Sequence, residues 1–212
     1  MIHELRMYTC RPGTAPKVIE ASGTVGQRIR NGDTYGRLEG HFGSEIGGLN
    51  QYVHLWSYAD VGELVRLRGE LGQLEAWRTE FVPLVAPHIL TQTVRVLRPA
   101  RDLRTPDTDG NIYELRVYRL KPGRAASWAE RMLAAFPARE KYSMNVGLWT
   151  TVFPDPNEVI HLWAYSSFEE RAKARAGSQA DPEWKAFLAE AVPDIEDMTS
   201  TILLPSAYSP RK

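Results

Sequence analysis

Hydrophobic and polar residues alternate at the start of the chain, and the spacing then changes to that of a helix. Residues 2–9 alternate, with Leu5 and Met7 on one side, which predicts a half-buried strand. Apolar residues then recur at helical spacing from Val18 to Ile29, which predicts a helix. Further strands are expected at residues 36–44, 53–58 and 91–97, with a second helical region before the last of them that buries Trp77, Phe81 and Leu84.

The same order of elements occurs a second time, and the sequence repeats with it. Residues 53–58 and residues 160–165 share the order His, Leu, Trp and Tyr at a separation of 107 positions. Upstream, residues 2–8 match residues 112–118, and the match continues downstream with small differences in loop length. Self-similarity at such a long period indicates a tandem duplication.

Each copy has the element order β-α-β-β-α-β, which is typical of a ferredoxin-like unit and places the chain in the α+β class. We expect a first unit at residues 1–98, a linker at residues 99–111 that is rich in Pro, Asp, Thr and Arg, and a second unit at residues 112–212. Helices cover only one face of such a sheet. The bare face needs a partner, and a duplicated chain carries one in its other half.

The alternation within the first and third strands of each copy predicts which side chains share a face. In the first copy Leu5, Met7, Val53 and Leu55 are expected under the helices. The other face then carries Glu4, Arg6, Tyr8, Tyr52, His54, Trp56 and Tyr58 in the first copy and Glu114, Arg116, Tyr118, Val159, His161, Trp163 and Tyr165 in the second. Because these strands are neighbours in a ferredoxin-like sheet, we expect a partly closed interior lined by both sets.

These residue types suit a ligand site. An Arg keeps a nearby Glu ionised, a His exchanges a proton near neutral pH, and Trp and Tyr form walls for a flat ligand. His54 and His161 are therefore the candidate catalytic residues. The candidate ligand-binding residues are Glu4, Arg6, Tyr8, Trp56, Tyr58, Glu114, Arg116, Tyr118, Trp163 and Tyr165. The alternative is purely structural, since two packed polar faces need paired charges and breaking a buried pair costs about 3–5 kcal/mol.

Charge balance and motif content exclude several function classes. Lys+Arg and Asp+Glu both number 26, so the chain has no net positive charge that would indicate nucleic acid or an anionic membrane as a partner. No apolar run approaches the roughly 18 residues of a membrane span, so we expect no membrane insertion. The sequence contains no metal-ligand cluster, Walker motif or dinucleotide fingerprint, so we expect no metal and no cofactor.

Two further residues bear on location and on a possible extra site. The opening residues read as a strand rather than a signal peptide, and the single cysteine, Cys10, fits a reducing compartment, so a cytoplasmic location is expected. Cys10 is interpreted as a small buried side chain. His41, near Glu39 and Glu45, is a further candidate that only the first copy carries, although a surface or hairpin role explains it better.

Three stretches resemble the NIPSNAP family: Gly-Gly-Leu-Asn-Gln-Tyr-Val-His-Leu-Trp-Ser-Tyr at 47–58, Tyr-Glu-Leu-Arg-Val-Tyr-Arg-Leu-Lys-Pro-Gly at 113–123, and Asp-Pro-Glu-Trp-Lys-Ala-Phe-Leu at 181–188. The resemblance covers both halves and implies a dimeric α/β-barrel fold, in which two ferredoxin-like units join their sheets within one chain. Similar barrels include cofactor-free monooxygenases and haem enzymes, but no haem-ligand pattern is found. Gly40-His41-Phe42 departs from the Gly-Tyr-Trp of the family, so the halves differ if this strand lines the pocket.

Three functions remain open. The first is a NIPSNAP-like protein that binds a small flat or acidic molecule in an aromatic, Arg- and His-lined pocket. The second is a cofactor-independent enzyme resembling a monooxygenase or an isomerase, with His54 or His161 as the base, Arg6 or Arg116 as the anion holder, and Trp56 or Trp163 as the wall. The third is a homo-oligomeric interaction scaffold. Fold-level analogy alone favours none of them.

Overall fold

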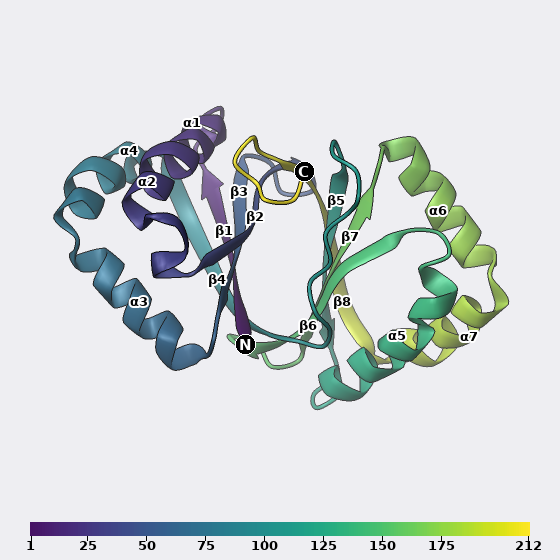
Figure 1. The fold of residues 1–212 in the computed structure, drawn as a ribbon. Helices are drawn as coiled ribbons and strands as arrows, with labels where there is room; N and C mark the ends of the chain where they lie inside the picture. Colours follow the sequence, from purple (N-terminus) through teal and green to yellow (C-terminus); the bar gives the residue numbers. More distant parts are fainter. The chain divides into compact units, whose positions relative to one another are not determined.

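The computed structural model describes residues 1–212, and each half contains four strands (Figure 1). The first half consists of β1 (Ile2–Cys10), α1 (Ala15–Ala21), a first π turn (Ser22–Gly26), α2 (Gln27–Arg30), β2 (Arg37–Ile46), β3 (Gln51–Tyr58), α3 (Val61–Gln73), a second π turn (Trp77–Phe81), α4 (Val82–Val85) and β4 (Ile89–Pro99). The second half consists of β5 (Ile112–Leu120), α5 (Ala125–Arg139), β6 (Met144–Phe153), β7 (Glu158–Tyr165), α6 (Phe168–Ala180), α7 (Pro182–Ala191) and β8 (Ile195–Pro205). Short 3₁₀ turns occur at Gly32–Tyr35, Ala86–His88 and Val192–Asp194.

The strands pair antiparallel within two compact units. The first unit contains residues 1–96 and 203–212, and the second unit contains residues 97–202. In the first unit β3 pairs with both β1 and β2, and in the second unit β7 pairs with both β5 and β6. This pairing, together with the helices of each unit, confirms the predicted α+β class with two ferredoxin-like units. The predicted division at residues 98 and 112 follows the sequence repeat and stays a prediction.

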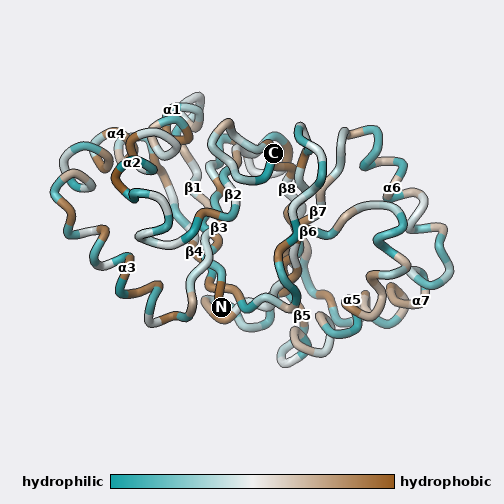
Figure 2. The backbone as a smooth tube through the Cα atoms, in the orientation of Figure 1, coloured by the Kyte–Doolittle hydropathy of each residue, from teal (hydrophilic) through white to brown (hydrophobic).

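Side-chain caps begin the helices that follow the third strand of each half. The Asp60 side chain accepts from the backbone N–H of Glu63 at 2.9 Å, in the predicted capping-box spacing. In the second half Ser167 caps α6 in the same way. Leu64, Leu67 and Leu71 form the buried stripe of α3, and its alternating brown and teal colour follows this periodicity (Figure 2). No helix is both long enough and apolar enough to cross a membrane.

A bulge interrupts the second strand of each half at a glycine. The register shifts between Leu38 and Gly40 in β2, and the same shift precedes Gly147 in β6. A Cβ atom on Gly40 would lie 2.3 Å from the Phe42 ring, and one on Gly147 would lie 2.4 Å from the Trp149 ring. Both positions therefore need glycine because an aromatic ring two residues later occupies the space of a side chain.

The even-numbered residues of β1 and β3 face the helices, contrary to the prediction. Trp56 packs with Leu64 and Leu67 of α3, and Tyr52 packs with Val18 of α1. By strand alternation, the side chains that were expected under the helices lie on the opposite face: Leu5, Met7, Val53 and Leu55. That assignment was wrong because residues on both faces of these strands are buried, so apolarity alone does not identify the helix-covered side.

Substituting the bulge glycine tests this packing. We expect Gly147→Ala to destabilise the protein by about 1–3 kcal/mol, because the added methyl group must displace the Trp149 ring. Gly69→Ala is the control, since no atom lies within 4 Å of a Cβ at this position in α3. The control should stabilise the protein by about 0.5–1 kcal/mol through helix propensity. Urea denaturation of both variants measures the difference, and unchanged stability of Gly147→Ala would contradict the described packing.

Candidate active site

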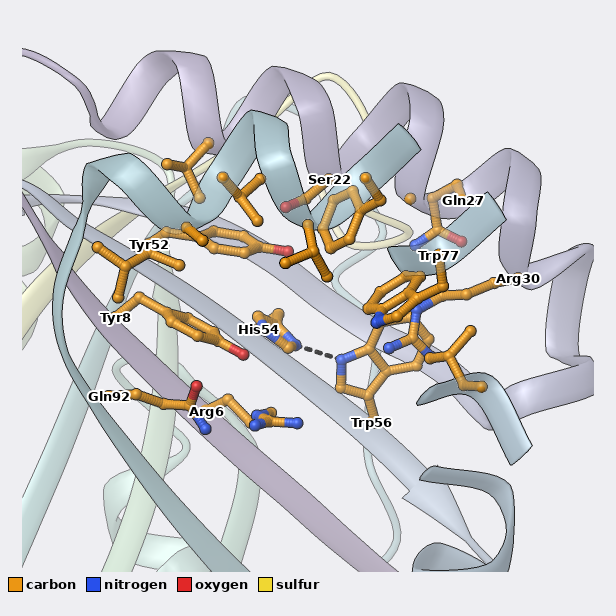
Figure 3. Close-up of a pocket in the computed structure, with 18 of the residues that line it drawn as sticks. Arg6, Tyr8, Ser22, Gln27, Arg30, Tyr52, His54, Trp56, Trp77 and Gln92 are labelled. Atoms are coloured by element: carbon orange, nitrogen blue, oxygen red, sulfur yellow. Dashed lines mark hydrogen bonds between the residues drawn. The ribbon is translucent and has the colours of Figure 1, made fainter. Parts of the chain in front are cut away.

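A cavity of about 400 Å³ lies in the first unit between the central strands and the helical segments that cover them (Figure 3). Its strand-borne walls are Arg6 and Tyr8 from β1 and Tyr52, His54 and Trp56 from β3. Helical segments contribute Ser22, Gly26, Gln27, Arg30, Arg68, Trp77 and Phe81, and β4 contributes Gln92. Both π turns of the unit therefore line the cavity, and such turns are frequent at functional sites.

Aromatic rings form one wall of this cavity. The pairing of β1 with β3 sets Arg6 opposite His54 and Tyr8 opposite Tyr52. The His54 ring is stacked with the ring of Tyr8 at 5.4 Å and with the ring of Tyr52 at 4.7 Å between centroids. Because alternate residues of a strand share one face, two short stretches of sequence are enough to build this wall.

His54 is a neutral hydrogen-bond donor. Nε1 of Trp56 donates a hydrogen bond to Nδ1 of His54. An indole N–H can only donate, so Nδ1 is unprotonated and the neutral ring carries its proton on Nε2. Burial, together with the positive charge of Arg6, holds the pKa of His54 well below its usual value of 6.5. At neutral pH the ring therefore has no charge and no free basic nitrogen.

Three guanidinium groups line the cavity, and no carboxylate does. The Arg30 guanidinium lies 4.0 Å from the centroid of the Trp56 ring and 5.2 Å from that of Trp77. Burial and the nearby charge of Arg68 lower the pKa of Arg30 to about 10, which leaves it protonated at neutral pH. Nε of Arg6 is buried and has no hydrogen-bond partner. The lining of the cavity is therefore positively charged.

A buried carboxylate beside the cavity balances part of this charge. Glu4 accepts a hydrogen bond from Nε of Arg68 at 3.0 Å, and Nη1 of Arg6 lies 3.6 Å from its other oxygen. The Tyr58 hydroxyl donates to the same carboxylate at 3.4 Å. The pair of Glu4 with Arg6 is thus present, but Arg68, from the covering helix α3, is the closer partner.

The second unit contains an equivalent cavity of about 250 Å³. Nε1 of Trp163 donates to Nδ1 of His161 at 2.6 Å, and the Arg139 guanidinium lies 4.3 Å from the Trp163 ring. Arg116 and Arg175 are the other guanidinium groups in the lining. Burial and the charge of Arg116 hold the pKa of His161 well below 6.5, and its buried Nε2 has no hydrogen-bond partner.

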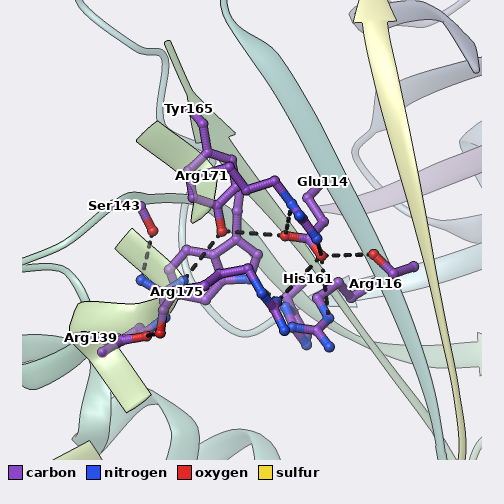
Figure 4. Close-up of polar contacts among 11 residues, drawn as sticks. Glu114, Arg116, Arg139, Ser143, His161, Tyr165, Arg171 and Arg175 are labelled. Carbon is purple, nitrogen blue, oxygen red and sulfur yellow. Dashed lines mark hydrogen bonds and ion pairs between the residues drawn. The ribbon is translucent and has the colours of Figure 1, made fainter. Parts of the chain in front are cut away.

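Glu114 forms the corresponding carboxylate network of the second unit (Figure 4). Arg171 donates to its two oxygens at 3.0 and 2.8 Å, and the Ser200 hydroxyl donates at 2.7 Å. Burial alone raises the pKa of Glu114. The hydrogen bonds from Arg171 and Ser200 and the charge of Arg116 outweigh burial and lower that pKa to about 2. Glu114 is therefore ionised at neutral pH.

The predicted site residues fall into two groups. Both candidate catalytic histidines and six of the candidate ligand-binding residues line the cavities: Arg6, Tyr8, His54, Trp56, Arg116, Tyr118, His161 and Trp163. The other candidates stand outside the lining and belong to the carboxylate networks: Glu4, Tyr58, Glu114 and Tyr165. The action of any of these residues on a ligand stays a prediction.

Sequence reasoning missed the arginines that the helices contribute. Arg30 and Arg139 stack on the tryptophan of the third strand in their respective units. Arg68 and Arg175 are 107 positions apart, the same offset as the repeated His-Leu-Trp strands. A residue-by-residue comparison of the two copies would have found this second pair, because the duplication retains the positive charge.

His41 and Cys10 are core residues. Nδ1 of His41 lies 2.7 Å from the Ser206 hydroxyl, and the His41 ring lies 4.8 Å from that of Tyr52. The expected surface or hairpin position of His41 is therefore wrong, and burial lowers its pKa to about 4. Cys10 is free and buried. The structure contains no group of three His, Cys, Asp or Glu side chains arranged to hold a metal ion.

Comparison with known proteins identifies relatives over the whole chain. A model of the NIPSNAP family matches residues 3–104 and 113–210. The human Protein NipSnap homolog 3B is 28% identical over 215 residues, which cover 99% of this chain and 85% of that protein. A Dictyostelium discoideum Protein NipSnap homolog is 26% identical over 210 residues, which cover 96% of this chain and 87% of that protein. The solved structure of an anthrone oxidase-like protein aligns with a TM-score of 0.70 and 12% identity over 97% of this chain and 91% of the other, a likeness of fold alone.

The buried carboxylate network predicts a specific loss of stability at low pH. Glu114→Gln removes the charge opposite Arg171, and we expect a loss of about 2–3 kcal/mol, below the roughly 3–5 kcal/mol of a fully buried pair because Arg171 is partly exposed. The folded-state pKa of about 2 lies below the ordinary 4.5. The contribution of ionised Glu114 to the free energy of unfolding is therefore complete above pH 4.5 and is lost as the pH falls toward 2.

Urea denaturation of the wild type and the variant between pH 7 and pH 3 measures this difference. Glu196→Gln is the control, since Glu196 pairs with Arg119 at the surface and such pairs contribute about 0–1 kcal/mol. A difference between Glu114→Gln and the wild type that does not shrink below pH 4.5 would contradict the assigned charge network.

Proposed function

This chain belongs to the NIPSNAP family, and from that premise we propose that it binds a small, flat, anionic molecule in the cavity of the first unit. The equivalent cavity of the second unit serves as a smaller second site. The observation that carries the proposal is a lining with three guanidinium groups and no carboxylate in each cavity. A cationic ligand would meet three like charges there, whereas a carboxylate gains charge-assisted hydrogen bonds.

The walls of the first cavity support a flat ligand body. Trp56, Trp77 and Tyr52 present ring faces and edges around the same space as the arginines (Figure 3). Aromatic walls favour planar ligands through stacked or edge-to-face contacts. A volume of about 400 Å³ falls within the range of roughly 300–1,000 Å³ that is usual for small-molecule sites.

Arg6 and His54 provide the donors that would orient the acid group. Nε of Arg6 is buried without a partner, and Arg6 lies opposite His54 in the strand pairing. A carboxylate at this position accepts from the guanidinium and from Nε2–H of His54. Leaving Nε of Arg6 buried without a partner costs free energy, which a bound anion would recover.

The hydrogen bond from Trp56 favours binding over the enzymatic alternative. A general base needs an unprotonated nitrogen within reach of the substrate. Nδ1 of His54 is occupied by the indole N–H, and its other nitrogen carries the proton. The same arrangement recurs at His161 with Trp163. Both histidines are therefore better suited to donate a hydrogen bond to an anion than to remove a proton from a substrate.

Location and assembly remain part of the proposal. The single cysteine, which is free and buried, supports a reducing compartment, and we propose a cytoplasmic location on that basis. We also retain the proposal of a homo-oligomer. Native mass spectrometry at micromolar concentration tests it, and a monodisperse monomer would reject both the oligomer and the scaffold function.

Titration with 2-naphthoate, followed by tryptophan fluorescence, tests the proposed binding. We expect Arg6→Met and Arg116→Met, combined in one variant, to weaken binding by tenfold or more, because a hydrogen bond between charged groups contributes about 1.5–3 kcal/mol. Arg66→Met is the matched control, since this exposed arginine of α3 pairs with Glu70 and lines neither cavity. Equal affinity of the double variant and the control would reject the proposal.

The pH dependence of the same titration separates the two roles of His54. The ring does not titrate around its ordinary value of 6.5, because burial and Arg6 hold the pKa of His54 well below it. We therefore expect the affinity for naphthoate to stay constant between about pH 5.5 and pH 8. A change in affinity with a midpoint near pH 6.5 would show that His54 titrates normally and would reject its assignment as a neutral donor.

A further inference from the structure

We propose that the two cavities select different acids. The first unit takes a planar acid that carries a second polar group, a hydroxyl or a carbonyl, away from its acid group. The second unit takes a smaller planar acid that lacks this second polar group. This inference rests on the proposed function, because it names the ligand class of each of the two sites.

The acid-binding ends of the two cavities are alike. Arg6 and Arg116 occupy equivalent positions, each opposite the histidine of the neighbouring strand. A second arginine stacks on the tryptophan of that strand in both units. Each unit therefore retains the charge that holds an acid group, so a difference in selectivity must come from the rest of the lining.

Three polar positions of the first cavity are apolar in the second copy. Ser22 and Met132 both lie nine residues after the glycine of the Pro-Gly turn, and Tyr52 and Val159 both lie two residues before the histidine. Gln92 of the first cavity corresponds to Met198, five residues after the matching prolines. Met132 and Met198 line the second cavity, whose neutral polar side chains are Tyr118, Ser178 and Gln179 at other positions. At each of these positions the first copy thus has a polar side chain and the second copy an apolar one.

The polar groups of the first cavity lie close together. Tyr52 and Ser22 are buried, and burial raises the pKa of Tyr52 while a hydrogen bond with Ser22 opposes that rise. The rings of Tyr8 and Tyr52 are stacked on each other at 5.7 Å between centroids and both lie beside His54, with both hydroxyl groups directed into the cavity (Figure 3). A ligand hydroxyl or carbonyl placed here finds both a donor and an acceptor, because a hydroxyl group serves as either.

Backbone geometry explains the difference in volume. The first π turn brings the small residues Ser22 and Gly26 to the first cavity. The equivalent positions of α5, which is an uninterrupted α-helix, carry Met132 and Phe136. The Phe136 ring packs edge-on against Trp163 at 5.8 Å, whereas Gly26 has no side chain and lies against the Phe81 ring. The cavities of about 400 and about 250 Å³ follow from this exchange of side chains.

Two probe acids test the selectivity, one cavity at a time. Arg116→Met leaves the first cavity intact, and Arg6→Met leaves the second intact. We expect the Arg116→Met protein to bind 6-hydroxy-2-naphthoate about tenfold more tightly than 2-naphthoate, since one neutral hydrogen bond contributes up to about a factor of ten. The Arg6→Met protein should not share this preference, because its intact cavity carries methionine at the positions of Ser22 and Gln92. Isothermal titration calorimetry measures the four affinities.

A second pair of substitutions assigns the preference to particular hydroxyl groups. Ser22→Ala with Tyr52→Phe, introduced into the Arg116→Met protein, should bring the ratio of the two affinities to about one. Circular dichroism and urea denaturation verify that each variant is folded. The selectivity is overturned if the ratio of the affinities for 6-hydroxy-2-naphthoate and 2-naphthoate is equal in the two cavities, or if these substitutions leave the ratio unchanged. Either result is compatible with the proposed function. Absence of binding of both acids to the unaltered protein overturns both.

Discussion

A buried carboxylate, bound to arginines of the covering helix, decides which face of the sheet lies under the helices in each unit. Glu4 on β1 is bound to Arg68 on α3, and Glu114 on β5 is bound to Arg171 on α6. Removing one partner of a buried pair costs about 3–5 kcal/mol, and shifting a strand by one residue turns every side chain to the other face. The strand is therefore fixed with its charged and aromatic face toward the helices.

The same constraint creates the cavity. The carboxylate pairs with some of the guanidinium N–H groups. The other N–H groups lie beside aromatic rings, next to a cavity that the helices cover but do not fill. The tryptophan of the third strand then fixes the tautomer of the histidine two residues earlier. The same residues thus stabilise the fold and form the proposed site, in which the carboxylates would position the arginines and the histidine toward the ligand.

Much of this arrangement could be predicted from the sequence. The repeat of the His-Leu-Trp strand revealed the duplication, and period-two alternation grouped Arg6, Tyr8, His54 and Trp56 on one face. Alternation could not decide toward which layer that face points, because Leu5 and Val53 on the opposite face are also buried. Arg30 was missed because its place over Trp56 depends on the path of the helical segment, which passes through a π turn that local patterns do not predict.

The central claim is that the charged aromatic face binds an anion on the helix side of the sheet. A crystal structure of the protein with 6-bromo-2-naphthoate, phased on the anomalous signal of bromine, tests it most directly. The account predicts the bromine in the cavity of the first unit, with the carboxylate on Arg6 and His54. A bromine on the opposite face of the strands, beside Leu5 and Val53, would contradict it.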